Sequence, residues 1–447
     1  MIRSARAKKN PVRYSTPMLL LVSLCLLLAQ HYLPSVVHGG MDSNYLIAQS
    51  NGNLPRQLSY ITLGLIGLLG IVHATRWKRR AFVWNYWMVV PIALLLGWCL
   101  LSLLWSDMAG IATKRLLVVG LMFLGSFGLA VSWEAIDIVR FIALSSALDI
   151  SIGFAGEVVS GYFTPASADY RFSGTLTPNE QGYLCMVLTI SSMCLIRMLK
   201  SQGGSTWLYR ILAVSGVIFL LLSRSRGALI SLGIAVLFYF LLVMHARRKV
   251  MLTLLIGSFV LTLAVSGAGN QILNALDRGG EGDQNFTGRA PLWTELMEYV
   301  DERPWTGRGY ESFWNAETMD DVYKHQHWPV ESAHSEYVES LLTIGIIGMV
   351  LHTIALLAGM IEGIRLFRAS QNPVFFLAST FCCIYLVGGS LEAILIVKPS
   401  PISFYLAMLL SSMMVRTQTG EAPVRLRGRG ALFFGQLTRK AERPLHS

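Results

Sequence analysis

The chain has 447 residues, of which 53% are hydrophobic and only 14% are charged. Soluble domains carry roughly 25% charged residues, so this composition excludes an ordinary soluble enzyme and indicates an integral membrane protein. The net charge of +11 does not indicate a nucleic-acid partner, because most basic residues lie in short loops between apolar runs, where they set membrane orientation.

About twelve apolar runs approach the ~20 residues that a helix needs to cross the hydrocarbon core. The expected fold is therefore all-α: a polytopic membrane bundle of about twelve transmembrane helices, with one long outer loop that contains short helices. The expected spans are roughly 17–34, 58–74, 83–104, 115–132, 137–158, 181–198, 208–222, 227–244, 250–268, 336–361, 374–397 and 401–415. The chain then divides into helices one to nine (1–268), the outer loop (269–335), helices ten to twelve (336–415) and a basic tail (416–447).

Basic residues predict the orientation of the chain. Clusters at 3–13, 76–80, 247–249 and 425–429 fall on one side of the predicted bundle. Because cytoplasmic loops are enriched in Lys and Arg, this side is expected to be cytoplasmic. An even number of spans returns both termini to it and leaves the loop 269–335 outside.

Four basic residues depart from this distribution. Lys114 and Arg115 lie at an outer boundary, and Arg224 and Arg226 lie in a tight outer turn between two spans. For the two arginines of this turn, two interpretations stay open: long side chains that snorkel to the interface, or an anion site that faces a cavity.

Acidic residues within the spans also gather toward the predicted outer side. Together they indicate a wet pocket that opens outward, because ionisable groups in a membrane need solvent or partners. They are Asp149, Glu157, Glu336, Glu339 and Glu392.

The outer loop contains one predicted amphipathic helix. Pro291 suits a first helical turn, and Leu292 and Leu296 recur at helical spacing over 290–302. The segment 305–314 reads as a turn followed by an aromatic plug. Since the loop is rich in acids, Arg289 is either an anion ligand or a partner in a plain salt bridge.

His334 lies where the outer loop meets the apolar run 340–360. The positive end of the helix dipole disfavours imidazolium, so His334 is expected to be neutral at pH 7 and able to accept a proton. Tyr337 shares its helix face, and Glu336 and Glu339 follow on other faces. A hydrogen-bonded structural histidine is the alternative.

No metal or cofactor site is expected. His325, His327 and His334 lie close in sequence, with Asp320 and Asp321 nearby, but no Cys joins them and no His-Glu-x-x-His motif occurs. The six cysteines fall in apolar runs and are expected to be small buried hydrophobes. The chain also has no phosphate-binding loop of the Gly-Lys-Ser type, no dinucleotide fingerprint and no Gly-x-Ser-x-Gly context for a serine nucleophile.

Four segments occur in order between about 220 and 350. They are Ser225-Arg226-Gly227-Ala228; Gly288-Arg289 followed by Leu292-Trp293; Pro304-Trp305-Thr306-Gly307-Arg308-Gly309-Tyr310 with Phe313; and His334 with Tyr337, Leu341, Gly345 and Gly348. Together they resemble the O-antigen ligase and O-antigen polymerase superfamily. These are bacterial inner-membrane glycosyltransferases that use undecaprenyl-diphosphate-linked glycans at the periplasmic face. Ser335 stands where the family has Asn.

The resemblance implies a role for each matched residue. His334 would take the proton of an acceptor hydroxyl, while Arg289 and Arg226 would hold the diphosphate without a metal. The partners would be the lipid-linked glycan, a glycan or lipid A core acceptor, and membrane lipid around the prenyl chain. Further candidate substrate-binding residues are Arg224, Arg115, Lys114, Tyr337 and Glu339.

Other functions also fit the sequence. A polysaccharide transporter or flippase is the main alternative, although the chain lacks the internal repeat of such proteins; a structural or sensory membrane protein is another. Within the family, the segment 309–314 looks like exopolysaccharide polymerases, while ligases and protein glycosylation enzymes stay possible. The catalytic hypothesis requires His334, Arg226 and Arg289 to line one outer cleft.

Overall fold

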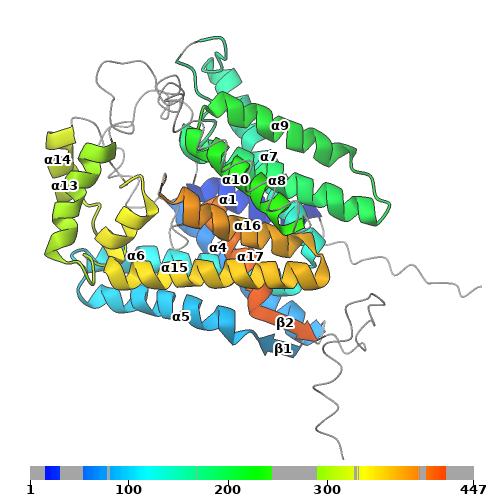
Figure 1. The fold of residues 1–447 in the computed structure, drawn as a ribbon, viewed down its shortest axis with the longest axis horizontal. Coiled ribbons are helices and arrows are strands. Elements are labelled where there is room, and N and C mark those ends of the chain that lie inside the picture. The colour runs from blue at the N-terminus through cyan, green and yellow to red at the C-terminus, as the bar shows by residue number, and fades with distance from the viewer. Residues whose placement is uncertain are drawn as a thin grey trace, which may run out of the picture.

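The computed structural model describes residues 16–30, 54–77, 81–167, 169–243, 289–326, 330, 332–390, 392 and 399–418. Helices form most of this part of the chain (Figure 1). In order, the elements are α1 (Thr16–Gln30), α4 (Leu54–Val72) with a π-helical turn (His73–Trp77), β1 (Ala81–Trp84), α5 (Tyr86–Leu101) with a 3-10 turn (Ser102–Leu104), α6 (Ala109–Ser132), α7 (Ala135–Ser160), α8 (Pro178–Ser201), α9 (Trp207–Ser223), α10 (Arg226–Val243), α13 (Arg289–Glu302), α14 (Ala316–Gln326), α15 (Glu336–Ser370), α16 (Pro373–Gly388), α17 (Pro401–Met414) and β2 (Val415–Gln418).

Six of the described helices are long and apolar enough to cross a membrane, so the chain is a multi-pass helical membrane protein, as its composition predicts. They are α4, α5, α6, α7, α8 and α15. Five shorter apolar helices, α1, α9, α10, α16 and α17, coincide with five further predicted spans. The span predicted at 250–268 lies outside the described residues, so a total of twelve stays a prediction.

Glycines bring α4 and α6 into backbone contact. A Cβ at Gly67 would lie 2.2 Å from the carbonyl oxygen of Leu124, and one at Gly128 would lie 1.9 Å from that of Gly67. Small residues at such positions let membrane helices approach closely, which replaces the hydrophobic driving force that lipid cannot supply.

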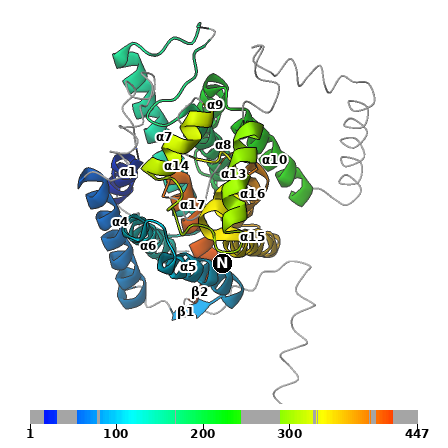
Figure 2. The ribbon, with the colours of Figure 1, turned by 90° about the vertical axis from the view of Figure 1, so that its left-hand side faces the viewer.

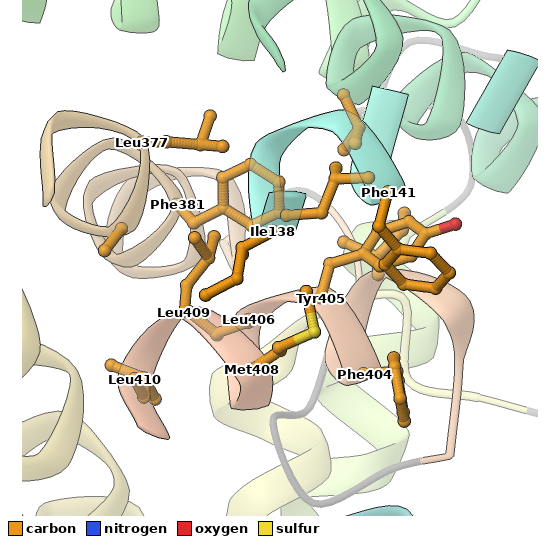
Figure 3. Close-up of a cluster of buried hydrophobic side chains, with 14 of the residues drawn as sticks. Ile138, Phe141, Leu377, Phe381, Phe404, Tyr405, Leu406, Met408, Leu409 and Leu410 are labelled. Atoms are coloured by element: carbon orange, nitrogen blue, oxygen red, sulfur yellow. The ribbon is translucent and has the colours of Figure 1, made fainter. Parts of the chain in front are cut away.

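Helix α17 is buried on all sides at the centre of the bundle. Phe404, Leu406, Met408 and Leu409 are each fully buried, and Figure 3 shows them among side chains from α7 and α16. A helix that is apolar all round is typical of a bundle core, which explains how a 14-residue helix is accommodated.

The two strands are an addition that the sequence analysis did not predict. β1 and β2 are antiparallel, with Ala81 opposite Gln418 and Trp84 opposite Val415. The ring of Trp84 also stacks on Phe127 of α6, with centroids 5.8 Å apart. The first residues of the segment expected as a tail therefore pair with the segment that precedes α5.

Helices α13 and α14 lie at the other end of the molecule and cover part of the bundle (Figure 2). Leu292, Leu296 and Val300 of α13 form a small core with Val322 of α14 and Leu342 of α15. The helix predicted over 290–302 coincides with α13, whereas α14 was not predicted.

Helix α15 has a sharp elbow at Gly345, where φ is 68° and ψ is −175°. The turn 304–309 fills the elbow: Arg308 N donates to Leu342 O at 2.9 Å and Ile346 N donates to Pro304 O at 2.9 Å. These bonds satisfy backbone groups that the break in the helix would otherwise leave unpaired. The span predicted over 336–361 coincides with most of α15, but the elbow sets its first turns apart as a separate arm.

Candidate functional site

Glu392 joins two residues that the sequence analysis selected. Its Oε1 lies 3.0 Å from His334 Nδ1, and its Oε2 lies 3.3 Å from Arg289 Nη2. The carboxylate comes from the segment after α16, the imidazole lies two residues before α15, and the guanidinium begins α13. Tertiary structure therefore brings an imidazole and a guanidinium, far apart in sequence, onto one carboxylate.

All three side chains keep some exposed surface. The exposed fraction is 25% for His334, 19% for Arg289 and 14% for Glu392. The cluster is thus accessible to a ligand, yet sheltered enough that its electrostatic interactions are stronger than in bulk water.

The backbone around His334 is firmly held. His334 has φ of 49°, in the left-handed region that residues other than glycine seldom adopt. Ala333 O accepts from Trp293 Nε1 at 2.8 Å, and Ala333 N donates to Glu339 Oε2 at 2.8 Å. The other oxygen of Glu339 accepts from Trp314 Nε1 at 2.8 Å. A costly conformation held by surrounding contacts is common at functional sites.

Two residues extend the cluster toward α8 and α9. Asn179, in the first turn of α8, donates from Nδ2 to Glu392 Oε2 at 3.0 Å. Arg171 donates to Asn179 Oδ1 at 2.8 Å and, through Nε, to Ser223 O at 3.2 Å. A continuous set of contacts therefore links the carboxylate to the turn between α9 and α10.

Glu392 is held as a carboxylate. Burial alone would raise its pKa, but the hydrogen bond and charge of His334, together with Arg289, lower the pKa below its ordinary value of 4.5. The helix α16 ends at Gly388, so Glu392 lies beyond it rather than inside the span predicted over 374–397.

The turn between α9 and α10 carries the two predicted arginines. Arg224 has φ of 50° and an exposed side chain, whose Nη2 lies 3.4 Å from Ser167 O. Arg226 is the first residue of α10 and is half-buried. Ser225 packs on Gly182 of α8, where an added Cβ would lie 2.6 Å from the Ser225 Cβ. This packing fixes the turn near the start of α8.

The remaining predicted residues lie in other surroundings. Arg115 of α6 pairs with Glu311, at 3.6 Å between Nη1 and Oε2, and Lys114 beside it is exposed. Tyr337 donates its hydroxyl hydrogen to Leu386 O of α16. Glu339 is buried beneath the His334 segment, as described above.

No sequence motif points to a catalytic role for Glu392, or to Asn179 or Arg171. Glu392 stood out only as one of several acids in apolar runs. Its distinguishing feature, contact with residues 58 and 103 positions away, is set by tertiary structure.

Metal ligands do not cluster in the part of the chain that the structure describes, where no three His, Cys, Asp or Glu side chains are placed to share an ion. His325 Nδ1 instead lies 3.1 Å from Glu295 Oε1. His327 lies outside the described residues.

The cluster contains the parts of an acid–base centre. An imidazole whose Nδ1 contacts a carboxylate is fixed in orientation, and its other ring nitrogen then accepts protons in the neutral tautomer. A nearby guanidinium suits an anionic group, since its planar donors match phosphate geometry.

A search of curated proteins found no match. Residues 211–353 match the family model described as O-antigen ligase, a segment that includes Arg226, Arg289 and His334. This segment of the chain is thus similar to the O-antigen ligase family, which supports the resemblance found in the sequence.

Proposed function

We propose that this protein is a glycosyltransferase that transfers or polymerises a glycan from an undecaprenyl-diphosphate carrier at the outer face of the bacterial inner membrane. The observation that carries the proposal is the contact of Glu392 with both His334 and Arg289. The family match supports transfer of lipid-linked glycan in general.

In the proposed reaction, His334 is the base. Glu392 accepts a hydrogen bond from Nδ1–H of His334, which leaves Nε2 able to take a proton. Nε2 takes the proton of the acceptor hydroxyl as that oxygen bonds to the anomeric carbon. The bond between this carbon and the phosphate oxygen breaks, and its electron pair leaves with the diphosphate. Attack opposite the leaving group inverts the configuration at the sugar.

Arg289 and Arg226, with Arg224, are proposed to bind the diphosphate. Guanidinium groups neutralise the charge that grows on the leaving oxygen, and each such donor contributes on the order of 10²–10³ in rate. Arg289 pairs with Glu392 in the cluster. Arg226 begins α10, directly after the turn in which Ser223 O accepts a hydrogen bond from Arg171.

The other predicted residues have supporting roles in the proposal. Glu339 and Tyr337 position the start of α15 through their contacts with Ala333 N and Leu386 O. Lys114 and Arg115 remain proposed contacts for an anionic headgroup at the membrane boundary.

The proposal is tested by glycan transfer in membranes that contain His334→Ala, Arg289→Ala or Arg226→Ala. Each variant is expected to lose transfer by about 10²-fold or more. Arg140→Ala is a matched control, because Arg140 pairs with Asp137 on α7, at 3.0 Å. Normal product from folded His334→Ala would remove this residue as the base.

Cell polysaccharide from a deletion strain separates polymerase from ligase. Loss of long chains is the expected result for a polymerase. Intact lipid-linked polymer with uncapped core is the result for a ligase.

A further inference from the structure

A concave site lies near the cluster, in the connection between α7 and α8. Its volume is about 350 Å³, at the small end of ligand pockets. The side chains that line it are mostly polar, and those that matter here are Tyr162, Thr164, Ser167, Asp169 and Arg171.

Two residues that line this cavity, Tyr170 and Ser173, are held by Glu157, a fully buried carboxylate of α7. Glu157 Oε1 accepts from Ser173 N at 2.9 Å and from Gly174 N at 2.7 Å, while Oε2 accepts from Tyr170 OH at 2.6 Å. Burying a carboxylate is costly unless hydrogen bonds satisfy it, so these bonds fix the path of the segment 170–174. Phe172 N also donates to Leu222 O at 2.9 Å.

Arg171 connects the cavity to the reaction centre. It lines the cavity, and its Nη2 donates to Asn179, which in turn donates to Glu392. The cavity is thus two side chains away from the carboxylate that contacts His334. A ligand that contacts His334 and extends along the protein surface toward Arg171 would enter this cavity.

The charges of the cavity favour a neutral polyol over a second phosphate. Asp169 and Arg171 both line it, so an anion would meet a carboxylate as well as a guanidinium. Sugar hydroxyls can donate hydrogen bonds to the carboxylate of Asp169 and accept them from the guanidinium of Arg171. Tyr162 adds an aromatic ring, whose face suits the apolar side of a pyranose.

We propose that this cavity is a glycan subsite that binds a sugar ring near the one that reacts. The inference rests on the proposed glycosyl transfer. The sugar belongs either to the lipid-linked donor or to the acceptor chain, since both present the same hydroxyl chemistry.

The test uses the full-length protein and two variants, Tyr162→Ala and Asp169→Asn. Matched controls are Tyr323→Ala and Asp320→Asn, because both side chains are exposed on α14 and neither lines the cavity. The KM for one glycan substrate should rise about tenfold in the cavity variants, with little change in kcat. Varying donor and acceptor concentrations separately identifies which substrate occupies the subsite. If the donor occupies the subsite, a donor with a single sugar should show no such difference, whereas if the acceptor occupies it, the difference should persist with that donor.

Binding of oligosaccharide from the cell's own polysaccharide, measured by titration calorimetry, separates this inference from the proposed transfer. Binding that is weaker for the cavity variants but not for the control variants supports the subsite, even in protein that shows no glycan transfer. Unchanged KM and binding in folded Tyr162→Ala and Asp169→Asn would overturn the subsite, whatever the activity of the wild-type protein.

Discussion

At the scale of single residues, Glu392 is the group on which the proposed chemistry depends. It contacts His334, Arg289 and Asn179, which come from three separate segments. A carboxylate in this position orients the imidazole and stabilises the imidazolium that forms during proton transfer.

Replacement of this carboxylate by an amide tests that role. Glu392→Gln keeps the shape of the side chain but removes its charge, so transfer should fall by about 10²-fold or more. Initial rates in membranes measure the effect. Asp320→Asn, which removes an exposed carboxylate of α14, should leave the rate unchanged.

The low pKa of Glu392 predicts how stability depends on pH. Because its folded pKa lies below 4.5, the carboxylate stabilises the fold above pH 4.5, and that stabilisation is lost as the pH falls through the folded value. The difference in thermal stability between wild-type protein and Glu392→Gln should therefore shrink below this pH. A difference that grows with acidity would show that Glu392 is not stabilised as a carboxylate.

At the scale of elements, the elbow of α15 determines how the outer layer meets the bundle. Gly345 adopts a left-handed conformation, and an added Cβ would lie 2.3 Å from Trp305 O. The first arm of the helix carries Glu339, which holds the segment before His334. The elbow thus sets the position of the proposed base.

Gly345→Ala is expected to lower the unfolding free energy by about 2 kcal/mol or more, since it adds both backbone strain and a backbone clash. Thermal unfolding in detergent measures this change. Gly97→Ala of α5 is the control, because a Cβ there meets nothing within 4 Å. Equal thermal stability of the Gly345→Ala and Gly97→Ala variants would show that the elbow does not require glycine at position 345.

Apolar runs predicted most of the helices, because a membrane helix must satisfy its backbone internally and bury few charges. Pro291 likewise predicted the start of α13. The elbow could not be predicted, since Gly345 lies in an apolar run and its break depends on the distant turn 304–309. Similarly, His334 and Arg289 were identifiable by motif, whereas Glu392 became important only through contacts between distant segments.

At the scale of the whole molecule, the proposed site lies toward the end that carries α13 and α14, and the two strands lie at the other end (Figure 1). The basic loops predict that the strands are cytoplasmic and that α14 is outside. This orientation follows from the sequence, and it is open to direct measurement.

Cysteine labelling tests the orientation. A membrane-impermeant maleimide should label Asp320→Cys of α14 in intact spheroplasts, and Val83→Cys of β1 only after lysis, because both side chains are exposed at opposite ends. The wild-type protein, whose cysteines are buried or half-buried, controls for background labelling. If only Val83→Cys were labelled in intact spheroplasts, the orientation would be the opposite of the one predicted.

The most direct test of the account is a double-mutant cycle between His334 and Glu392, measured as the rate of glycan transfer. If the carboxylate acts through the imidazole, His334→Ala with Glu392→Gln should be no slower than His334→Ala alone, because the first change already removes the group that the second would disorient. Losses that multiply, as for two independent sites, would contradict a shared centre.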